Sequence, residues 1–182
     1  EVIKLTDRTD FNHFFAKKEL QNHIKTGTFN FKKALTAGNT TLAGFKNLIS
    51  LYSLQLNAVI DEHGDTALIL AAAKGHIEIV NALLDVTGIN VNTANQYGNT
   101  ALILAVDKGH TDIVKALLAK EGIDANAADQ DGETALICAA AKGHTDIVKA
   151  LLAKEGIDAN AATNNGDTAL ILAAAKGHIE IV

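Results

Sequence analysis

Long stretches of this 182-residue sequence occur twice, letter for letter. GDTALILAAAKGHIEIV fills positions 64–80 and again 166–182, and KGHTDIVKALLAKEGIDANAA fills 108–128 and again 142–162. Three residue types recur at steps of 34: Gly64, Gly98, Gly132 and Gly166; Thr66, Thr100, Thr134 and Thr168; His76, His110, His144 and His178. A fixed period of this length is typical of a solenoid, in which one small structural unit stacks on the next. The period divides the chain into units at 61–94, 95–128 and 129–162 and a truncated unit at 163–182.

Each 34-residue unit predicts a turn followed by two short helices. Gly64 provides the backbone freedom of a tight turn, and Thr66 stands where the N-cap of a helix is expected. The segment ALILAAAK should form the first helix, which Gly75 ends. A second helix should run from about His76 until Gly88 breaks it. Its apolar face is predicted to contain Ile77, Val80, Leu83 and Leu84.

Neither helix is long enough to be stable alone. Each has about ten residues or fewer, whereas isolated helices shorter than roughly 12–15 residues are marginal in water. Their apolar faces must therefore be buried against neighbouring units, and at least three stacked units are needed. The small side chains of Ala71, Ala72 and Ala73 should let the first helices of adjacent units pack closely.

The pattern GxTALIxAxxKGHxxIVxALL, followed by GIxxN, resembles the ankyrin repeat over residues 61–182. The resemblance implies an all-α solenoid of helix–turn–helix units with short β-turn or hairpin loops. Three features differ from the family pattern: Ala67 and its equivalents replace a proline, Ile69 and its equivalents replace a histidine, and the period is 34 rather than about 33 residues. Because that histidine makes hydrogen bonds between loops in the family, apolar packing should take its place here.

Residues 1–56 differ in composition from the repeats. They contain all six phenylalanines, and their eight basic and four acidic residues give a net charge of +4, whereas residues 57–182 carry −9. One amphipathic stripe contains Leu42, Phe45, Leu48, Ile49 and Tyr52. We expect an N-terminal helical cap that includes a degenerate first repeat. The alternatives are a separate bundle that binds a ligand or partner, or a basic surface for nucleic acid or membrane; because acidic residues such as Asp10 and Glu19 are interspersed, we expect a solvated face and no nucleic-acid binding.

No arrangement of residues predicts catalysis, a metal site or a cofactor site. The repeated histidines lie one to a unit, about 10 Å apart in a helical stack, which is too far to share an ion bound at about 2.1 Å. Cys138, the only cysteine, occupies a column that holds leucine in the other units, so we expect a core residue rather than a nucleophile. There is no phosphate-binding glycine loop and no run of about 20 apolar residues that could span a membrane. We therefore expect no enzyme activity and no cofactor.

Comparison of the units with each other identifies positions that vary while the rest of the unit stays fixed. They lie at the turn tips and on the first helix, which form the concave face that the resemblance implies for partner binding. The predicted partner-binding residues are Glu62, His63, Asp65, Gln96, Tyr97, Asn99, Asp107, Gln130, Asp131, Glu133, Asn164, Asn165 and Asp167. Tyr97 is the best single candidate, because it is the only aromatic residue of the array and tyrosine is typical of interface anchors. Solvated turn tips also vary freely, which is the alternative interpretation.

The sequence therefore predicts a module for protein–protein interaction whose partner carries a basic surface, because the tips are acidic. One alternative is a regulatory or targeting segment of a larger enzyme or secreted effector whose catalytic domain lies outside this chain. Another is a designed scaffold with no natural partner. The single cysteine favours the cytoplasm or another reducing compartment, and delivery into a host cell is a further alternative. Because the fourth unit leaves an apolar face open, we expect further repeats in the native protein, or self-association through that end.

Overall fold

The computed structural model describes residues 57–59 and 61–182, and the cap predicted for residues 1–56 lies outside them. The described residues form seven α-helices and no extended strand. The first helices of the units are α5 (Ala67–Ala73), α7 (Ala101–Asp107), α9 (Ala135–Lys142) and α11 (Ala169–Lys176). The second helices are α6 (Ile77–Leu84), α8 (Thr111–Leu118) and α10 (Thr145–Leu152). The predicted all-α solenoid is confirmed.

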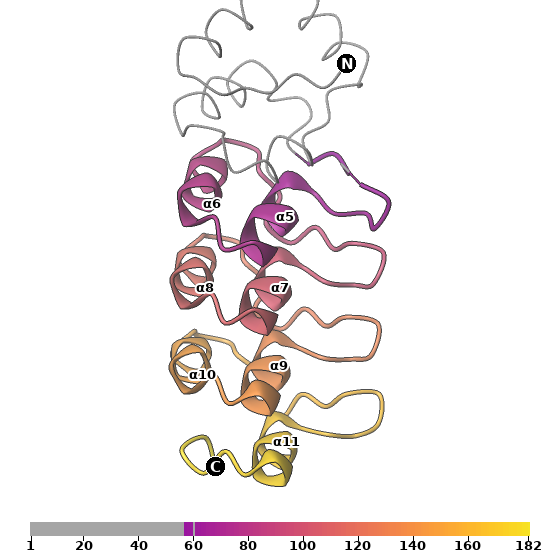
Figure 1. Ribbon diagram of the computed structural model, residues 1–182, viewed down its shortest axis with the longest axis vertical. Coiled ribbons are helices and arrows are strands. Elements are labelled where there is room, and N and C mark those ends of the chain that lie inside the picture. The colour runs from indigo at the N-terminus through magenta and orange to yellow at the C-terminus, as the bar shows by residue number, and fades with distance from the viewer. Residues whose placement is uncertain (1–56, 60) are drawn as a thin grey trace, which may run out of the picture.

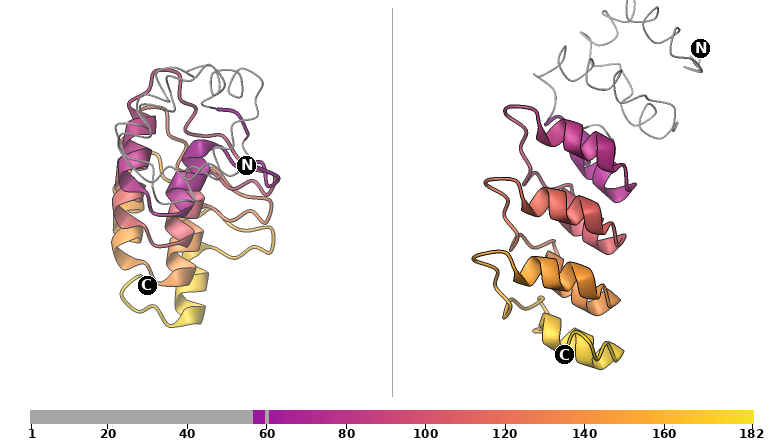
Figure 2. Two further views of the ribbon diagram at one scale, coloured as in Figure 1. Left: turned by 45° about the horizontal axis from the view of Figure 1, so that its top comes forward. Right: turned by 90° about the vertical axis from the view of Figure 1, so that its left-hand side faces the viewer.

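The helices form two columns. Figure 1 shows α5, α7, α9 and α11 stacked one above another, with α6, α8 and α10 in a second column beside them. The turns between units project as parallel fingers from the opposite side of the first helices, and Figure 2 shows the units as successive layers. Each unit therefore contacts the units directly above and below it, as expected for helices that are too short to be stable alone.

Threonine caps every first helix, as the sequence predicted. The Oγ1 atoms of Thr66, Thr100 and Thr134 each accept a hydrogen bond from the backbone N–H three residues later, at 3.3 Å. Thr168 does the same in the fourth unit. Each hydroxyl satisfies one of the N–H groups that a helix leaves unpaired at its start, which contributes about 1 kcal/mol.

The second helix ends earlier than the sequence predicted. α6 ends at Leu84, not at Gly88, and Asp85 is its C-cap. The N–H of Asp85 bonds to the carbonyl of Asn81, and the N–H of Val86 bonds to that of Leu83, only three residues back, so the last turn tightens and the chain leaves the helix there. Gly88 lies in the following loop with φ of +87°, a conformation that glycine adopts without steric cost.

The core runs along the contact between the two columns and between successive layers. Ala71, Ala105 and Ala139 are fully buried, which confirms that small side chains allow close packing of the first helices. Ile69 and Ile137 are also buried, so apolar packing fills the position at which the family pattern has histidine. Each buried leucine or isoleucine side chain contributes about 1.5–3 kcal/mol to this packing.

Polar side chains join the layers at the ends of the second helices. The Lys120 ammonium donates to the carbonyl of Leu84, and Lys154 donates to that of Leu118 at 2.9 Å. These carbonyls are at helix C-termini, where a positive charge is favourable. In the adjoining loop, Asn92 donates to the Gly122 carbonyl at 2.7 Å. The loops of successive units are thus fixed in register.

The fourth unit presents one face without a covering layer. Leu170 is 55% exposed, whereas Leu136, its equivalent one unit earlier, is 3% exposed. Residues 177–182 form turns rather than a second helix. Among the described residues, no helix has the length and apolar character needed to cross a membrane.

Candidate partner-binding surface

The turn tips are small hairpins held by their own side chains. An isolated β-bridge joins Ala94 to Thr100, and the Asn95 N–H donates to the Asn99 carbonyl at 3.0 Å. The Asn95 side-chain oxygen accepts from the backbone N–H groups of Tyr97 and Asn99, both at 3.0 Å. The next tip has the same bridge and the same side-chain bonds, made there by Asp129. Each tip is thus fixed before any partner arrives.

Successive tips also bond to one another. Backbone N–H groups donate to the carbonyl of the tip before: Gln96 to His63, Gln130 to Tyr97 and Asn164 to Asp131, at 2.9–3.0 Å. The side-chain amide of Gln130 donates to the Gln96 carbonyl at 2.6 Å, and that of Asn164 to the Gln130 carbonyl at 2.8 Å. These two predicted partner-binding residues therefore hold the tips together, a role that the sequence analysis did not identify.

The predicted residues fall into three classes of exposure. The exposed ones are Glu62, His63, Gln96, Tyr97, Gln130, Asp131, Asn164 and Asn165, and the half-buried ones are Asn99, Asp107, Glu133 and Asp167. Asp65 is different, because it is only 7% exposed and accepts a hydrogen bond from the Asn95 side chain at 2.7 Å. Asp65 therefore supports the neighbouring tip. We call the other twelve residues the tip surface.

Tyr97 is the largest exposed side chain of the tip surface. It is 51% exposed, and its hydroxyl lies 3.3 Å from Nδ1 of His63 on the preceding tip. The two rings are tilted by 39° with their centroids 6.0 Å apart. The contact gives the exposed tyrosine ring a partner on the preceding tip, and a side chain that is already in contact loses less entropy when a partner packs on it.

Asp107 joins two lysines at the end of α7. Its carboxylate lies 2.8 Å from the ammonium of Lys108 and 2.8 Å from that of Lys142 on the next unit. Burial raises the pKa of Asp107, but the hydrogen bonds and charges of the two lysines outweigh it, so the pKa is lowered. The hydrogen bond with Asp107 correspondingly raises the pKa of Lys142.

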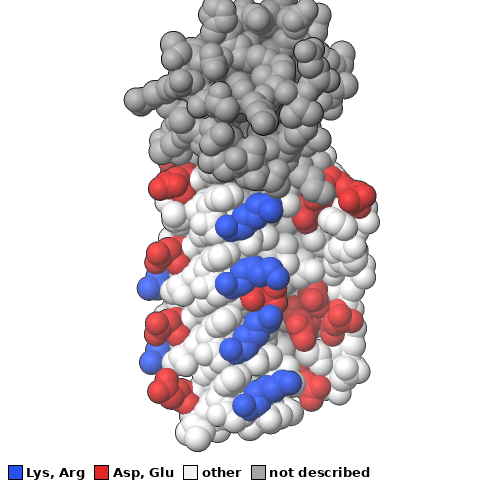
Figure 3. All heavy atoms as spheres, in the orientation of Figure 1, with Lys and Arg blue, Asp and Glu red and all other residues white. Residues whose placement is uncertain are grey.

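Acidic side chains cluster next to the ion pair of Asp107 and Lys142. Burial raises the pKa of Glu133, and the neighbouring charges of Asp129, Asp131 and Asp107 raise it further. Burial is the largest cause of this rise in pKa, and the repulsion of the three carboxylates exceeds the attraction of Lys142. Figure 3 shows acidic side chains grouped at the tips next to a column of basic side chains on the first helices.

The repeated histidines and the cysteine have structural surroundings. Nε2 of His110 lies 3.3 Å from the Ala73 carbonyl, and Nε2 of His178 lies 3.2 Å from the Ala141 carbonyl, so these rings join one unit to the next. Burial raises the pKa of the Cys138 thiol to about 12, whereas a reactive cysteine needs a lowered pKa. Within residues 57–59 and 61–182, no group of histidine, cysteine and acidic side chains has a geometry that could hold a metal ion.

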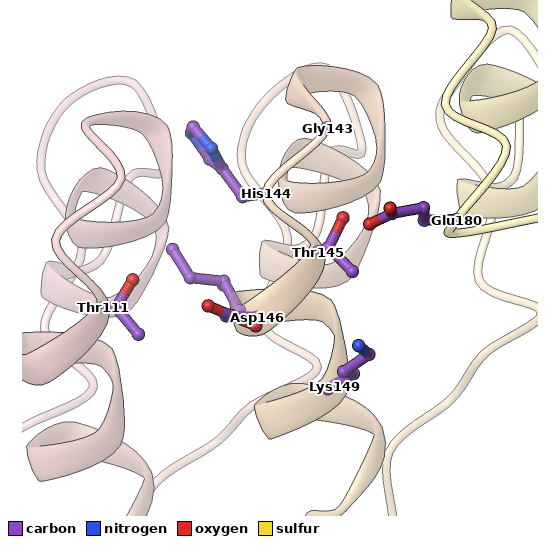
Figure 4. A pocket seen from close by; sticks show the side chains of 8 residues that line it. Thr111, Gly143, His144, Thr145, Asp146, Lys149 and Glu180 are labelled. Atoms are coloured by element: carbon purple, nitrogen blue, oxygen red, sulfur yellow. The ribbon is translucent and has the colours of Figure 1, made fainter.

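A polar hollow lies at the starts of the second helices. It has a volume of about 350 Å³, and Thr111, Asp146, Lys149 and Glu180 are among its lining residues. Figure 4 shows that these side chains come from three successive units, with Thr111 and Glu180 on either side of Asp146 and Lys149. The hollow contains no nucleophile paired with a base, so its geometry does not predict catalysis.

Stacked helix pairs with ordered, exposed turn tips define a helical repeat protein. The family model for ankyrin repeats, which spans three copies, matches residues 33–129 and 121–182. The chain therefore belongs to the ankyrin repeat family. No curated protein matches the chain. Ankyrin repeats are generally modules for protein–protein interaction, and the family fold is non-catalytic.

Proposed function

We propose that the chain binds a partner protein on the tip surface, with Tyr97 as the anchor and a basic surface on the partner. The observation that carries this proposal is the position of Tyr97, which is half exposed, held by His63 and followed along the array by the acidic residues of the third unit. Aromatic side chains of this kind contribute most of the binding energy at many interfaces. The surrounding carboxylates would steer a basic partner toward it.

The order of the tips supports the same proposal. The backbone bonds from Gln130 to Tyr97 and from Asn164 to Asp131 join three tips into one surface. A surface that is already ordered loses little entropy on binding, so more of the contact energy contributes to affinity. The residues that vary between units therefore lie on tips that are joined by backbone hydrogen bonds.

Pull-down from a lysate of the source cells, with mass spectrometry, tests the proposal. The test variant is Tyr97→Ala/Asp131→Ala/Glu133→Ala. The control variant, Asn81→Ala/Asp112→Ala/Asp146→Ala, removes the same charge from exposed positions on the second helices. We expect a protein that the wild type and the control recover and the test variant loses. Equal recovery by all three would place binding elsewhere.

Titration of that partner then tests the two parts of the proposal separately. Tyr97→Ala should raise Kd at least about ten-fold, because an anchor contributes roughly 2 kcal/mol or more. Raising the salt concentration from about 50 to 500 mM should weaken binding, because the charges are exposed and become screened. An affinity that does not change with salt would refute the basic partner while leaving the tyrosine anchor in place.

A further inference from the structure

One of the three junctions between units lacks a hydrogen bond that the others have. At the first and third junctions, the histidine before the second helix reaches the carbonyl of Ala73 or Ala141 at the end of the preceding first helix. His144 stands at the equivalent place in the second junction. Its Nε2 atom is buried and has no hydrogen-bond partner within the described part of the chain. A buried polar atom without a partner is destabilising.

The ring of His144 also lies farther from the unit before it. At the first junction, a Cβ atom built on Gly75 of the preceding unit would be 2.8 Å from Cε1 of His110. At the third junction, a Cβ atom built on Gly143 would be 2.7 Å from Cε1 of His178. The same distance for His144, measured from Gly109, is 3.2 Å. Because residues 108–128 and 142–162 are identical, the local sequence of His144 cannot explain the difference. The helix end that faces the ring is the part that differs.

That helix end is unusual at two positions. The last two residues of α7 are Val106 and Asp107, whereas α5 ends in two alanines and α9 has alanines at the equivalent positions. Val106 is fully buried, so its extra volume lies inside the stack. Asp107 places its carboxylate 2.8 Å from Lys142 of the next unit. The alanines at the other junctions cannot form such an ion pair.

We propose that the junction between the second and third units is the releasable junction of the array, and that the Asp107–Lys142 ion pair is its latch. The histidine bond that joins the other units is missing there, and a charged contact on the helix ends replaces it. The two side chains are 26% and 45% exposed, so dissolved salt reaches and weakens the pair. When the latch weakens, the third and fourth units open from the first two as a block more often.

Release would divide the tip surface. The backbone bond from Gln130 to Tyr97 crosses this junction, with Tyr97 on one side and Asp131 and Glu133 on the other. The latch thus changes how often the aromatic and acidic parts of the tip surface are separated. The inference concerns the free chain and does not depend on the proposed partner, so the two can fail separately.

Hydrogen exchange measured by mass spectrometry on the full chain tests the latch. In about 20 mM salt, Asp107→Ala should raise the opening constant of residues 135–152 about two- to five-fold, the range for an exposed ion pair. The change should disappear in about 500 mM salt. Residues 67–84 should keep their exchange rates in both conditions.

The third junction offers a matched control. Ala141→Asp places the same carboxylate between Lys142 and Lys176, so exchange of residues 169–176 should slow about two- to five-fold in low salt only. If Asp107→Ala leaves residues 135–152 unchanged in low salt, or acts equally in high salt, the latch is refuted. If Ala141→Asp does not slow exchange at its own junction, the ion pair is not the cause.

The histidines test the weak junction independently. His110→Ala removes a ring that bonds to the Ala73 carbonyl, whereas His144→Ala removes a ring whose Nε2 has no partner. Both substitutions lie in the same 21-residue sequence. We expect His110→Ala to raise the unfolding constant about ten-fold more than His144→Ala. Equal effects would overturn the assignment of the second junction as the weak one.

Discussion

Gly98 provides a direct test of how the tips are packed. It lies at the tip of the second unit with φ of +82°, and a Cβ atom there would be 2.8 Å from both Cα of Asp129 and the backbone nitrogen of Gln130. Both atoms belong to the backbone of the next tip, which cannot rotate away as a side chain would. Gly98→Ala should therefore push the third tip off the second.

Gly122 separates the effect of packing from that of backbone conformation. Its φ is +78°, close to that of Gly98, but a Cβ atom there would meet nothing within 4 Å. Both alanine variants pay for a left-handed conformation, about 1–2 kcal/mol. Only Gly98→Ala also loses the hydrogen bond from Gln130 to the Tyr97 carbonyl, worth about 0.5–1.5 kcal/mol. We expect losses of about 1–2 kcal/mol for Gly122→Ala and about 1.5–3.5 kcal/mol for Gly98→Ala.

Urea unfolding followed by circular dichroism measures both losses. The slope of the free energy with urea should stay at the wild-type value in each variant, so that the midpoint reports stability. If the two variants differ by less than about 0.5 kcal/mol, the tips do not constrain each other as described. Tip stacking would then contribute little to the order of the tip surface.

Other predictions follow from burial and from charge. Leu136→Ala should lower the free energy of unfolding by about 2–5 kcal/mol, and Leu170→Ala by clearly less, because Leu170 is half exposed; urea unfolding compares them. The Cys138 thiol should react with Ellman's reagent only after unfolding, because it is buried and burial raises its pKa to about 12. Burial and acidic neighbours raise the pKa of Glu133 above its ordinary 4.5, so Glu133→Gln should raise the free energy of unfolding at pH 7 by less than about 1 kcal/mol, measured as a higher Tm, and have no such effect below pH 4.5. The pKa of Asp107 is lowered, so its contribution to the free energy of unfolding is present above its ordinary pKa of 3.8 and is lost as the pH falls through the lower pKa of the folded chain. The difference in Tm between the wild type and Asp107→Ala should therefore disappear at a pH below that folded-state pKa.

Most of the fold could be predicted because its signals are local and repeated. The threonine caps, the small alanines and the glycine after the first helix each act within one helix or between adjacent ones, and the 34-residue period repeats every signal. Thr66 and Ala71 therefore have the predicted roles. The second helix was expected to continue until Gly88 but ends at Leu84, because the Val86 N–H bonds to the Leu83 carbonyl and tightens the last turn.

The tip surface was harder to predict because its contacts depend on how one unit sits on the next. Variation between units selected Gln130 and Asp65 along with Tyr97, but only the stacked tips show that Gln130 bonds to a neighbouring carbonyl and that Asp65 is buried. Likewise, Asp107 was selected because the equivalent position in the other units is an alanine. Its pairing with Lys142 depends on a spacing of units that no single 34-residue repeat contains.

The bonds between units give the array a direction. The backbone bonds between tips and the lysine bonds to helix ends all run from a donor on the later unit to a carbonyl on the earlier one. The side-chain amides of Asn92 and Asn126 donate in the other direction, to the carbonyls of Gly122 and Gly156 on the following units, so the two faces of a unit carry different groups and every contact is head-to-tail. Two copies that met through the exposed face of α11 would bring the same face together, so the backbone and lysine bonds that join the units could not form between them and a closed two-fold dimer is not favoured there. Association in the pattern the chain already uses would be polar and open-ended, like the growth of a filament.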